Sequence, residues 1–160
     1  DKYNITPRYY FGYGLSYTNF SFDKLEISPA NDNEKNSYKQ RRMRPYNNFG
    51  DSGLYEPVYS ITFVIKNTGN CYGSEVAQLY LGFPAEAQEP LKILRGFERV
   101  YLWPGESRPI TLTLTQKDIS YWNVIEQQWK VAQGTYTVSI STSANNADIK
   151  LQGSFNSFTF

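Results

Sequence analysis

Apolar and polar residues alternate with a period of two from residue 58 onward, and this alternation restricts most of the chain to β-strands. In segment 59–66, aromatic and aliphatic residues occupy the odd positions, whereas Ser60, Thr62 and Lys66 point to the opposite face. Other segments with this alternation, or with a shorter strand signal, are 20–27, 77–81, 100–102, 110–115, 134–140 and 149–155. Clusters of Asn, Gly and Pro separate them at short intervals. We therefore expect an all-β fold, an antiparallel sandwich of about seven strands in two sheets.

The N-terminal run from Pro7 to Phe20 does not follow this alternation. It holds six aromatic rings, two glycines and a proline in fourteen residues, which is too irregular for a helix or a single strand. Aromatic rings bury large areas, and glycines let a backbone pass close to a neighbouring surface. We expect residues 1–19 to form a linker or docking segment and residues 20–160 to form the sandwich.

Residues 28–57 are polar and irregular, and they interrupt the expected strands as a long insertion loop. Loops of this length in compact domains are usually functional or disordered. Their short basic cluster either contacts an anionic partner or is simply solvated or paired with carboxylates of another domain, and we favour the second interpretation. As a further hypothesis, the loop shapes the entrance to a substrate site on a neighbouring domain. The candidate contacts are Tyr38, Arg41, Arg42, Tyr46 and Phe49.

Composition excludes several classes of function. The net charge of +1 provides no global field for nucleic acid or an anionic membrane, and no apolar run reaches the ~20 residues that span a bilayer. Histidine is absent, which removes Ser-His, Cys-His and His-metal chemistry. We expect no metal and no cofactor. Cys71 is the only cysteine, so it is either a spare thiol or a bridge to a residue outside this chain.

Two Asn-X-Ser/Thr triplets, at Asn4 and Asn19, are candidate N-glycosylation sites and favour a secreted protein. The chain begins at Asp1 rather than at a methionine, which we interpret as a piece or processed product of something longer. A nicked enzyme, whose pieces remain bound to one another, is our hypothesis for its origin.

The tryptophans are candidate sugar-stacking platforms, since pyranose faces pack on aromatic rings as other apolar faces do. Trp122 and Trp129 flank an expected hairpin, and Trp103 precedes a turn. Packing in the core or at an interdomain surface is the alternative, and we favour it because no planar triplet at regular spacing is visible.

Several blocks together resemble the C-terminal domain of glycoside hydrolase family 3 enzymes, especially fungal β-glucosidases. The entry motif is Asp1-Lys2-Tyr3-Asn4-Ile5-Thr6-Pro7-Arg8-Tyr9, followed by Phe11-Gly12-Tyr13-Gly14-Leu15-Ser16-Tyr17-Thr18. Later blocks are Val64-Ile65-Lys66-Asn67-Thr68-Gly69, Gly73-Ser74-Glu75-Val76-Ala77-Gln78-Leu79-Tyr80-Leu81, Pro90-Leu91-Lys92-Ile93-Leu94-Arg95-Gly96-Phe97-Glu98-Arg99-Val100, Pro104-Gly105-Glu106-Ser107, Asp118-Ile119-Ser120-Tyr121-Trp122 and Gly134-Thr135-Tyr136-Thr137-Val138. They cover nearly the whole chain outside residues 28–57, in the order of that family.

The resemblance implies a fibronectin type III-like sandwich at the end of a multidomain, retaining β-glucosidase. The catalytic carboxylates of that family lie in a barrel and an α/β domain, and neither motif occurs here. Glycoside hydrolysis needs a pair of carboxylates, and no spacing in this chain marks one, so we assign no catalytic residue. The expected partners are the catalytic barrel and α/β domains of the parent enzyme, whose substrate is a β-glucoside. The expected docking residues are Tyr9, Phe11, Gly12, Tyr13, Gly14, Leu15 and Tyr17. The alternatives are a carbohydrate-binding module that targets the enzyme to its substrate, or the accessory domain of a β-xylosidase.

Overall fold

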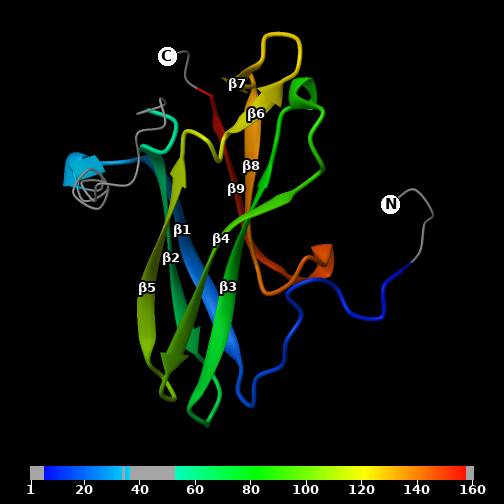
Figure 1. Ribbon diagram of the computed structural model, residues 1–160. Helices are drawn as coiled ribbons and strands as arrows, with labels where there is room; N and C mark the ends of the chain where they lie inside the picture. The colour runs from blue at the N-terminus through cyan, green and yellow to red at the C-terminus, as the bar shows by residue number, and fades with distance from the viewer. Residues whose placement is uncertain (1–5, 34, 37–52, 158–160) are drawn as a thin grey trace, which may run out of the picture.

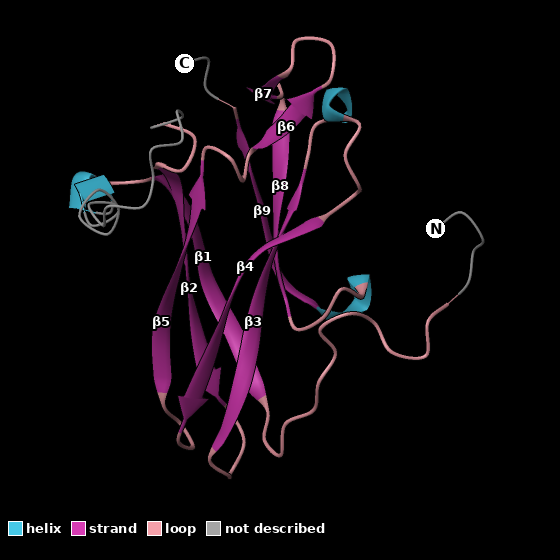
Figure 2. Ribbon diagram, in the orientation of Figure 1, coloured by secondary structure: helices cyan, strands magenta, loops and turns pink. Residues whose placement is uncertain are grey.

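The computed structural model describes residues 6–33, 35–36 and 53–157, and they form an antiparallel β-sandwich. One sheet has three strands in the order β1 (Phe20–Pro29), β2 (Pro57–Asn67) and β5 (Ser107–Thr115). The other has four, in the order β4 (Ile93–Leu102), β3 (Gly73–Gly82), β8 (Thr135–Ser141) and β9 (Ile149–Asn156). Figure 2 shows the two layers of strands and the short helical turns in the loops between them. The expected all-β sandwich is confirmed.

A separate hairpin, made of β6 (Ser120–Asn123) and β7 (Gln128–Val131), extends from one end of the sandwich. It lies at the end opposite the turn between β4 and β5 (Figure 1). Trp122 and Trp129 are directly paired across it, so the expected hairpin between them is confirmed. Two 3-10 turns, Ala85–Ala87 and Asn146–Asp148, occupy the β3–β4 and β8–β9 connections.

The side chains that alternation placed inside do form the core. Ile61, Phe63 and Ile65 of β2 face Leu79 and Leu81 of β3, and all five are fully buried. Tyr136 of β8 is buried with them, and its ring stacks on Phe155 at a centroid distance of 5.2 Å. Each such aromatic or aliphatic side chain contributes roughly 1.5–3 kcal/mol of burial free energy.

The alternation of apolar and polar residues did not predict that some side chains on the outer faces of the sheets are buried. Ser60 points away from the core, yet only 5% of it is exposed, because this small side chain lies on a central strand between Ser28 and Thr113. Gln78 and Tyr80 on the outer face of β3 are also buried. Alternation reports which face a side chain occupies, but it does not report what covers that face.

Two strand boundaries differ from those expected. β1 continues through Ser28 and Pro29, and Pro57 begins β2, so the insertion between them spans residues 30–56 rather than 28–57. β4 begins at Ile93, whereas the sequence predicted a strand only at 100–102. The earlier part of the strand was not predicted because Phe97 to Arg99 are exposed and interrupt the apolar pattern. In the described part of the chain, no helix is long and apolar enough to cross a membrane.

Candidate interdomain docking surface

The N-terminal segment, residues 6–19, passes beside the β8–β9 connection and the outer face of β3 before it reaches β1 (Figure 1). Gln78 of β3 holds it in place, since its Nε2 donates to the carbonyl oxygen of Gly12 at 3.0 Å and to that of Thr142 at 2.8 Å. The backbone N–H of Ala144 donates to the carbonyl oxygen of Phe11 at 2.8 Å. Phe11 and Gly12 lie in a turn that is closed by a hydrogen bond of 3.0 Å from the N–H of Tyr13 to the carbonyl oxygen of Tyr10. The segment is therefore attached through its backbone.

Gly12 satisfies two requirements at this turn. Its φ is +75°, in the left-handed region that L side chains rarely adopt, and a β-carbon there would lie 2.2 Å from Oε1 of Gln78. The close approach that the sequence predicted for this glycine is thus made to the chain's own sheet. Gly14 is different, because a β-carbon there would meet nothing within 4 Å.

A second attachment lies at the start of β1. The hydroxyl of Thr18 donates to Oδ1 of Asn67 at 2.8 Å, and the N–H of Thr68 donates to the carbonyl oxygen of Asn19 at 2.8 Å. Gly69 makes room for this contact, since a β-carbon there would lie 2.1 Å from Oγ1 of Thr18. The turn that follows β2 therefore clamps the end of the N-terminal segment.

Although the backbone is held at Phe11–Gly12 and at Thr18–Asn19, the large apolar side chains of the segment point to solvent. The exposed fractions are 64% for Tyr9, 71% for Phe11, 47% for Tyr13, 88% for Leu15 and 99% for Tyr17. The rings of Tyr9 and Tyr13 contact each other at a centroid distance of 5.4 Å, and the guanidinium of Arg8 lies 5.7 Å from the Tyr9 ring. A row of exposed apolar side chains on an ordered backbone is typical of an interaction surface.

The remaining predicted residues are distributed as follows. Asn19 is exposed at the start of β1, whereas Asn4 and the insertion residues Tyr38, Arg41, Arg42, Tyr46 and Phe49 lie outside the described residues. Cys71 is an exposed free thiol. No group of three or more His, Cys, Asp or Glu suited to a metal ion occurs in the described part of the chain.

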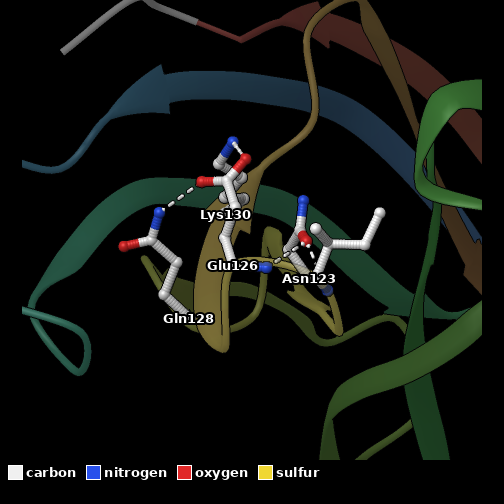
Figure 3. A network of polar contacts seen from close by, with 5 residues as sticks. Asn123, Glu126, Gln128 and Lys130 are labelled. Carbon is white, nitrogen blue, oxygen red and sulfur yellow. Dashed lines mark hydrogen bonds and ion pairs between the residues drawn. The ribbon is translucent and has the colours of Figure 1, made fainter.

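The β6–β7 hairpin carries a small network of polar contacts (Figure 3). Oδ1 of Asn123 accepts hydrogen bonds from the backbone N–H groups of Ile125 and Glu126, both at 3.0 Å, which fixes the turn. The Glu126 carboxylate accepts from Lys130 and from Gln128, and these hydrogen bonds lower its pKa. A carboxylate with this environment is suited to a structural turn rather than to proton transfer.

Sequence reasoning missed the polar residues that organise the docking segment. Asn67 and Gln78 entered the sequence analysis only as members of the blocks that carry the resemblance, without a structural role of their own. Both are buried, with exposed fractions of 0% and 4%. Their signal was an amide side chain within a block of apolar strand residues, which marks a buried polar group that needs partners.

A protein-family model described as a fibronectin type III-like domain matches residues 75–144. A probable β-glucosidase D from Aspergillus niger is 44% identical over 155 residues, which is 97% of this chain and 20% of that protein. The crystal structure of a β-glucosidase from Chaetomella raphigera matches 98% of this chain and 21% of its own, with a TM-score of 0.82 and 38% identity. The crystal structure of a glycoside hydrolase family 3 β-glucosidase from Bifidobacterium adolescentis matches 98% of this chain and 19% of its own, with a TM-score of 0.74 and 27% identity. The chain therefore spans about a fifth of the length of these relatives.

Proposed function

Because this chain belongs to the fibronectin type III-like domains of glycoside hydrolase family 3 β-glucosidases, we propose that it is the structural accessory domain of such an enzyme. The parent enzyme hydrolyses terminal β-D-glucosyl residues with retention, through carboxylates that lie outside this chain. Relatives named as β-glucosidases favour this parent over a β-xylosidase.

The observation that supports an accessory role is the row of exposed apolar side chains on the N-terminal segment. Phe11, Leu15 and Tyr17 are each more than two-thirds exposed, although hydrogen bonds to Gln78 and Asn67 fix the segment that carries them. Burying several such side chains against the catalytic domains, at about 1.5–3 kcal/mol each, makes a permanent contact. The domain thus buttresses the catalytic domains and takes no part in the chemistry.

The test compares the same substitution in the whole protein and in this chain alone. Phe11→Ala and Leu15→Ala each lower the melting temperature of the whole protein by several degrees, leave its turnover of a short β-glucoside nearly unchanged, and have little effect on the 160-residue chain. Ile125→Ala is the matched control, because Ile125 is 94% exposed but belongs to the hairpin rather than to the segment. A loss of turnover without a loss of stability would contradict the buttressing role.

Secretion of the parent enzyme is part of the proposal, and Asn19 supports it as an exposed glycosylation candidate. Enzymatic removal of N-glycans from protein purified from its native source is expected to reduce the mass of the peptide that contains Asn19. An unmodified Asn19 in secreted protein would remove this site from the proposal.

A further inference from the structure

Three aromatic residues gather at the end of the sandwich opposite the hairpin, and they do not belong to the docking segment. Tyr72 directly precedes β3, Tyr101 lies in β4, and Trp103 directly follows β4. Gly73 pairs with Leu102 and Ser74 pairs with Tyr101, so the antiparallel register brings the three residues to one end of the same ladder. We name this set the aromatic platform.

The three rings contact one another and remain open to solvent. The centroids of Tyr72 and Tyr101 lie 6.4 Å apart with an interplanar angle of 19°, and those of Tyr72 and Trp103 lie 4.6 Å apart. The exposed fractions are 49% for Tyr72, 47% for Tyr101 and 66% for Trp103. The platform is therefore assembled without being part of the core.

Hydrogen bonds from one buried residue hold both loops that carry the platform. Nδ2 of Asn67 donates to the carbonyl oxygen of Cys71 at 2.8 Å and to that of Leu102 at 3.0 Å, and these residues immediately precede Tyr72 and Trp103. Oε2 of Glu106 accepts from the N–H of Trp103 at 2.8 Å. Because the loops are already fixed in the unbound protein, binding a ligand costs little additional conformational entropy.

The chemistry of the platform favours a neutral ligand with both an apolar face and polar edges. Each ring carries a polar group, a phenol hydroxyl or an indole N–H, and none of these three groups has a hydrogen-bond partner in the described part of the chain. In the described part of the chain, the ion pair of Arg108 with Glu106, at 3.2 Å, follows Trp103 in sequence, and its two charges offset each other. An apolar protein surface would leave the hydroxyls and the N–H unsatisfied.

We propose that Tyr72, Tyr101 and Trp103 form a carbohydrate-binding site for β-linked glucan. The equatorial hydroxyls of a β-linked glucosyl unit leave both faces of its ring lined with C–H groups, which stack on aromatic rings, while the hydroxyls at its edge meet the polar groups. The site holds a polymer close to the enzyme of which this domain is proposed to be part, and in this respect it deepens the proposed function.

Affinity electrophoresis of the whole protein through gels containing soluble mixed-linkage β-glucan tests the site. We expect the wild-type protein to be retarded in these gels and not in gels containing α-linked dextran. Trp103→Ala and Tyr72→Ala weaken binding by about tenfold, because each removes one stacking contact. Phe97→Ala is the matched control, since Phe97 is a 65% exposed aromatic residue of β4 outside the platform, and it keeps the wild-type retardation.

The outcomes separate this site from the proposed function. Absence of retardation of the wild-type protein, equal retardation in dextran, or unchanged retardation of Trp103→Ala would each overturn the platform. Unchanged retardation together with a lower melting temperature of Trp103→Ala would identify the platform as a protein contact and would also overturn it. Hydrolysis of cellobiose by the same preparations tests the parent activity, so either proposal can fail while the other stands.

Discussion

The hydroxyl of Thr18 donates a 2.8 Å hydrogen bond to Oδ1 of Asn67, and this contact joins the N-terminal segment to the turn after β2. The same Oδ1 accepts from the N–H of Gly69 at 3.0 Å, while Nδ2 donates to the carbonyl oxygens of Cys71 and Leu102. Asn67 is fully buried, and its side-chain amide takes part in all four of these hydrogen bonds. One side chain thus links the docking segment, the turn before β3 and the end of β4.

Asn67→Ala is expected to destabilise the domain by about 3 kcal/mol or more, because it leaves several buried polar groups without partners at about 1–3 kcal/mol each. Thr18→Val removes only the hydroxyl contact and is expected to cost about 1–2 kcal/mol. Urea unfolding monitored by tryptophan fluorescence measures both. Asn70→Ala is the control, since Asn70 is exposed in the same turn. Equal stability of the Asn67 and Asn70 variants would contradict this account of the turn.

Gly12→Ala is expected to detach the docking segment from its own sheet. The substitution forces an L side chain into φ +75° and drives a β-carbon to 2.2 Å from Oε1 of Gln78, so we expect a loss of about 2 kcal/mol or more. Gly14→Ala is the matched control, because its β-carbon meets nothing. Limited proteolysis within residues 6–18 measures the effect, and cleavage should accelerate for the Gly12 variant alone. Equal cleavage of both variants would show that the Gly12–Gln78 contact does not hold the segment.

The stability of the domain is expected to fall between pH 10 and 12 because of Tyr136. Burial raises the pKa of this tyrosine from 10.0 to about 12. Its hydroxyl donates to the carbonyl oxygen of Ile119 at 2.7 Å and accepts from the N–H of Ala132 at 3.0 Å. The folded state therefore holds the proton more tightly than the unfolded chain does, and this contribution is complete below pH 10 and lost as the pH rises through 12.

The measurement is the free energy of unfolding as a function of pH for the wild-type protein and for Tyr136→Phe. The variant should be less stable at neutral pH, because two buried backbone groups lose their hydrogen-bond partner. Between pH 10 and 12, its free energy of unfolding should fall by about 2–3 kcal/mol less than that of the wild-type protein. Burial also raises the pKa values of Tyr59 and Tyr80, so a smaller decline should remain. In the 160-residue chain by itself, Tyr17→Phe removes a hydroxyl from a 99% exposed residue and should reproduce the wild-type curve. Parallel curves for the wild-type protein and Tyr136→Phe would show that the loss of stability between pH 10 and 12 does not come from Tyr136.

The sandwich itself followed from the sequence, because strands with one buried face carry a period of two that survives without any tertiary information. Segment 59–66 is the clearest case, and its odd residues are buried as expected. Only the last part of β4 was predicted, at 100–102, because the exposed Phe97 and Arg99 of this edge strand interrupt the period of two. The burial of Gln78 was equally hidden, since it depends on a segment more than sixty residues away in sequence folding over the sheet.

The aromatic content of the N-terminal segment predicted a docking role, but it did not predict how the segment is held on its own domain. Its rings were expected to contact other domains, and that expectation stays a prediction. Within this chain, backbone groups and the Thr18 hydroxyl hold the segment, and the rings are exposed. Composition identifies which side chains are apolar, and only the fold decides which surface they meet. The same holds for Tyr72, which is distant in sequence from Tyr101 and Trp103 and is brought beside them by the β3–β4 register.

The pair formed by Trp122 and Trp129 is expected to stabilise the hairpin locally rather than the domain as a whole. The rings meet edge to face at a centroid distance of 5.6 Å, a geometry worth about 0.5–1.5 kcal/mol beyond simple burial. The base of the hairpin is anchored separately, by the contacts of Tyr136 with Ile119 and Ala132. Trp122→Ala should therefore accelerate amide hydrogen exchange in residues 120–131 while the exchange of the core strands stays slow. Val124→Ala, at a 72% exposed position in the turn, should leave exchange at the wild-type rate. Faster exchange throughout β3 and β8 after Trp122→Ala would mean that the hairpin and the sandwich unfold together, and the local assignment would then be wrong.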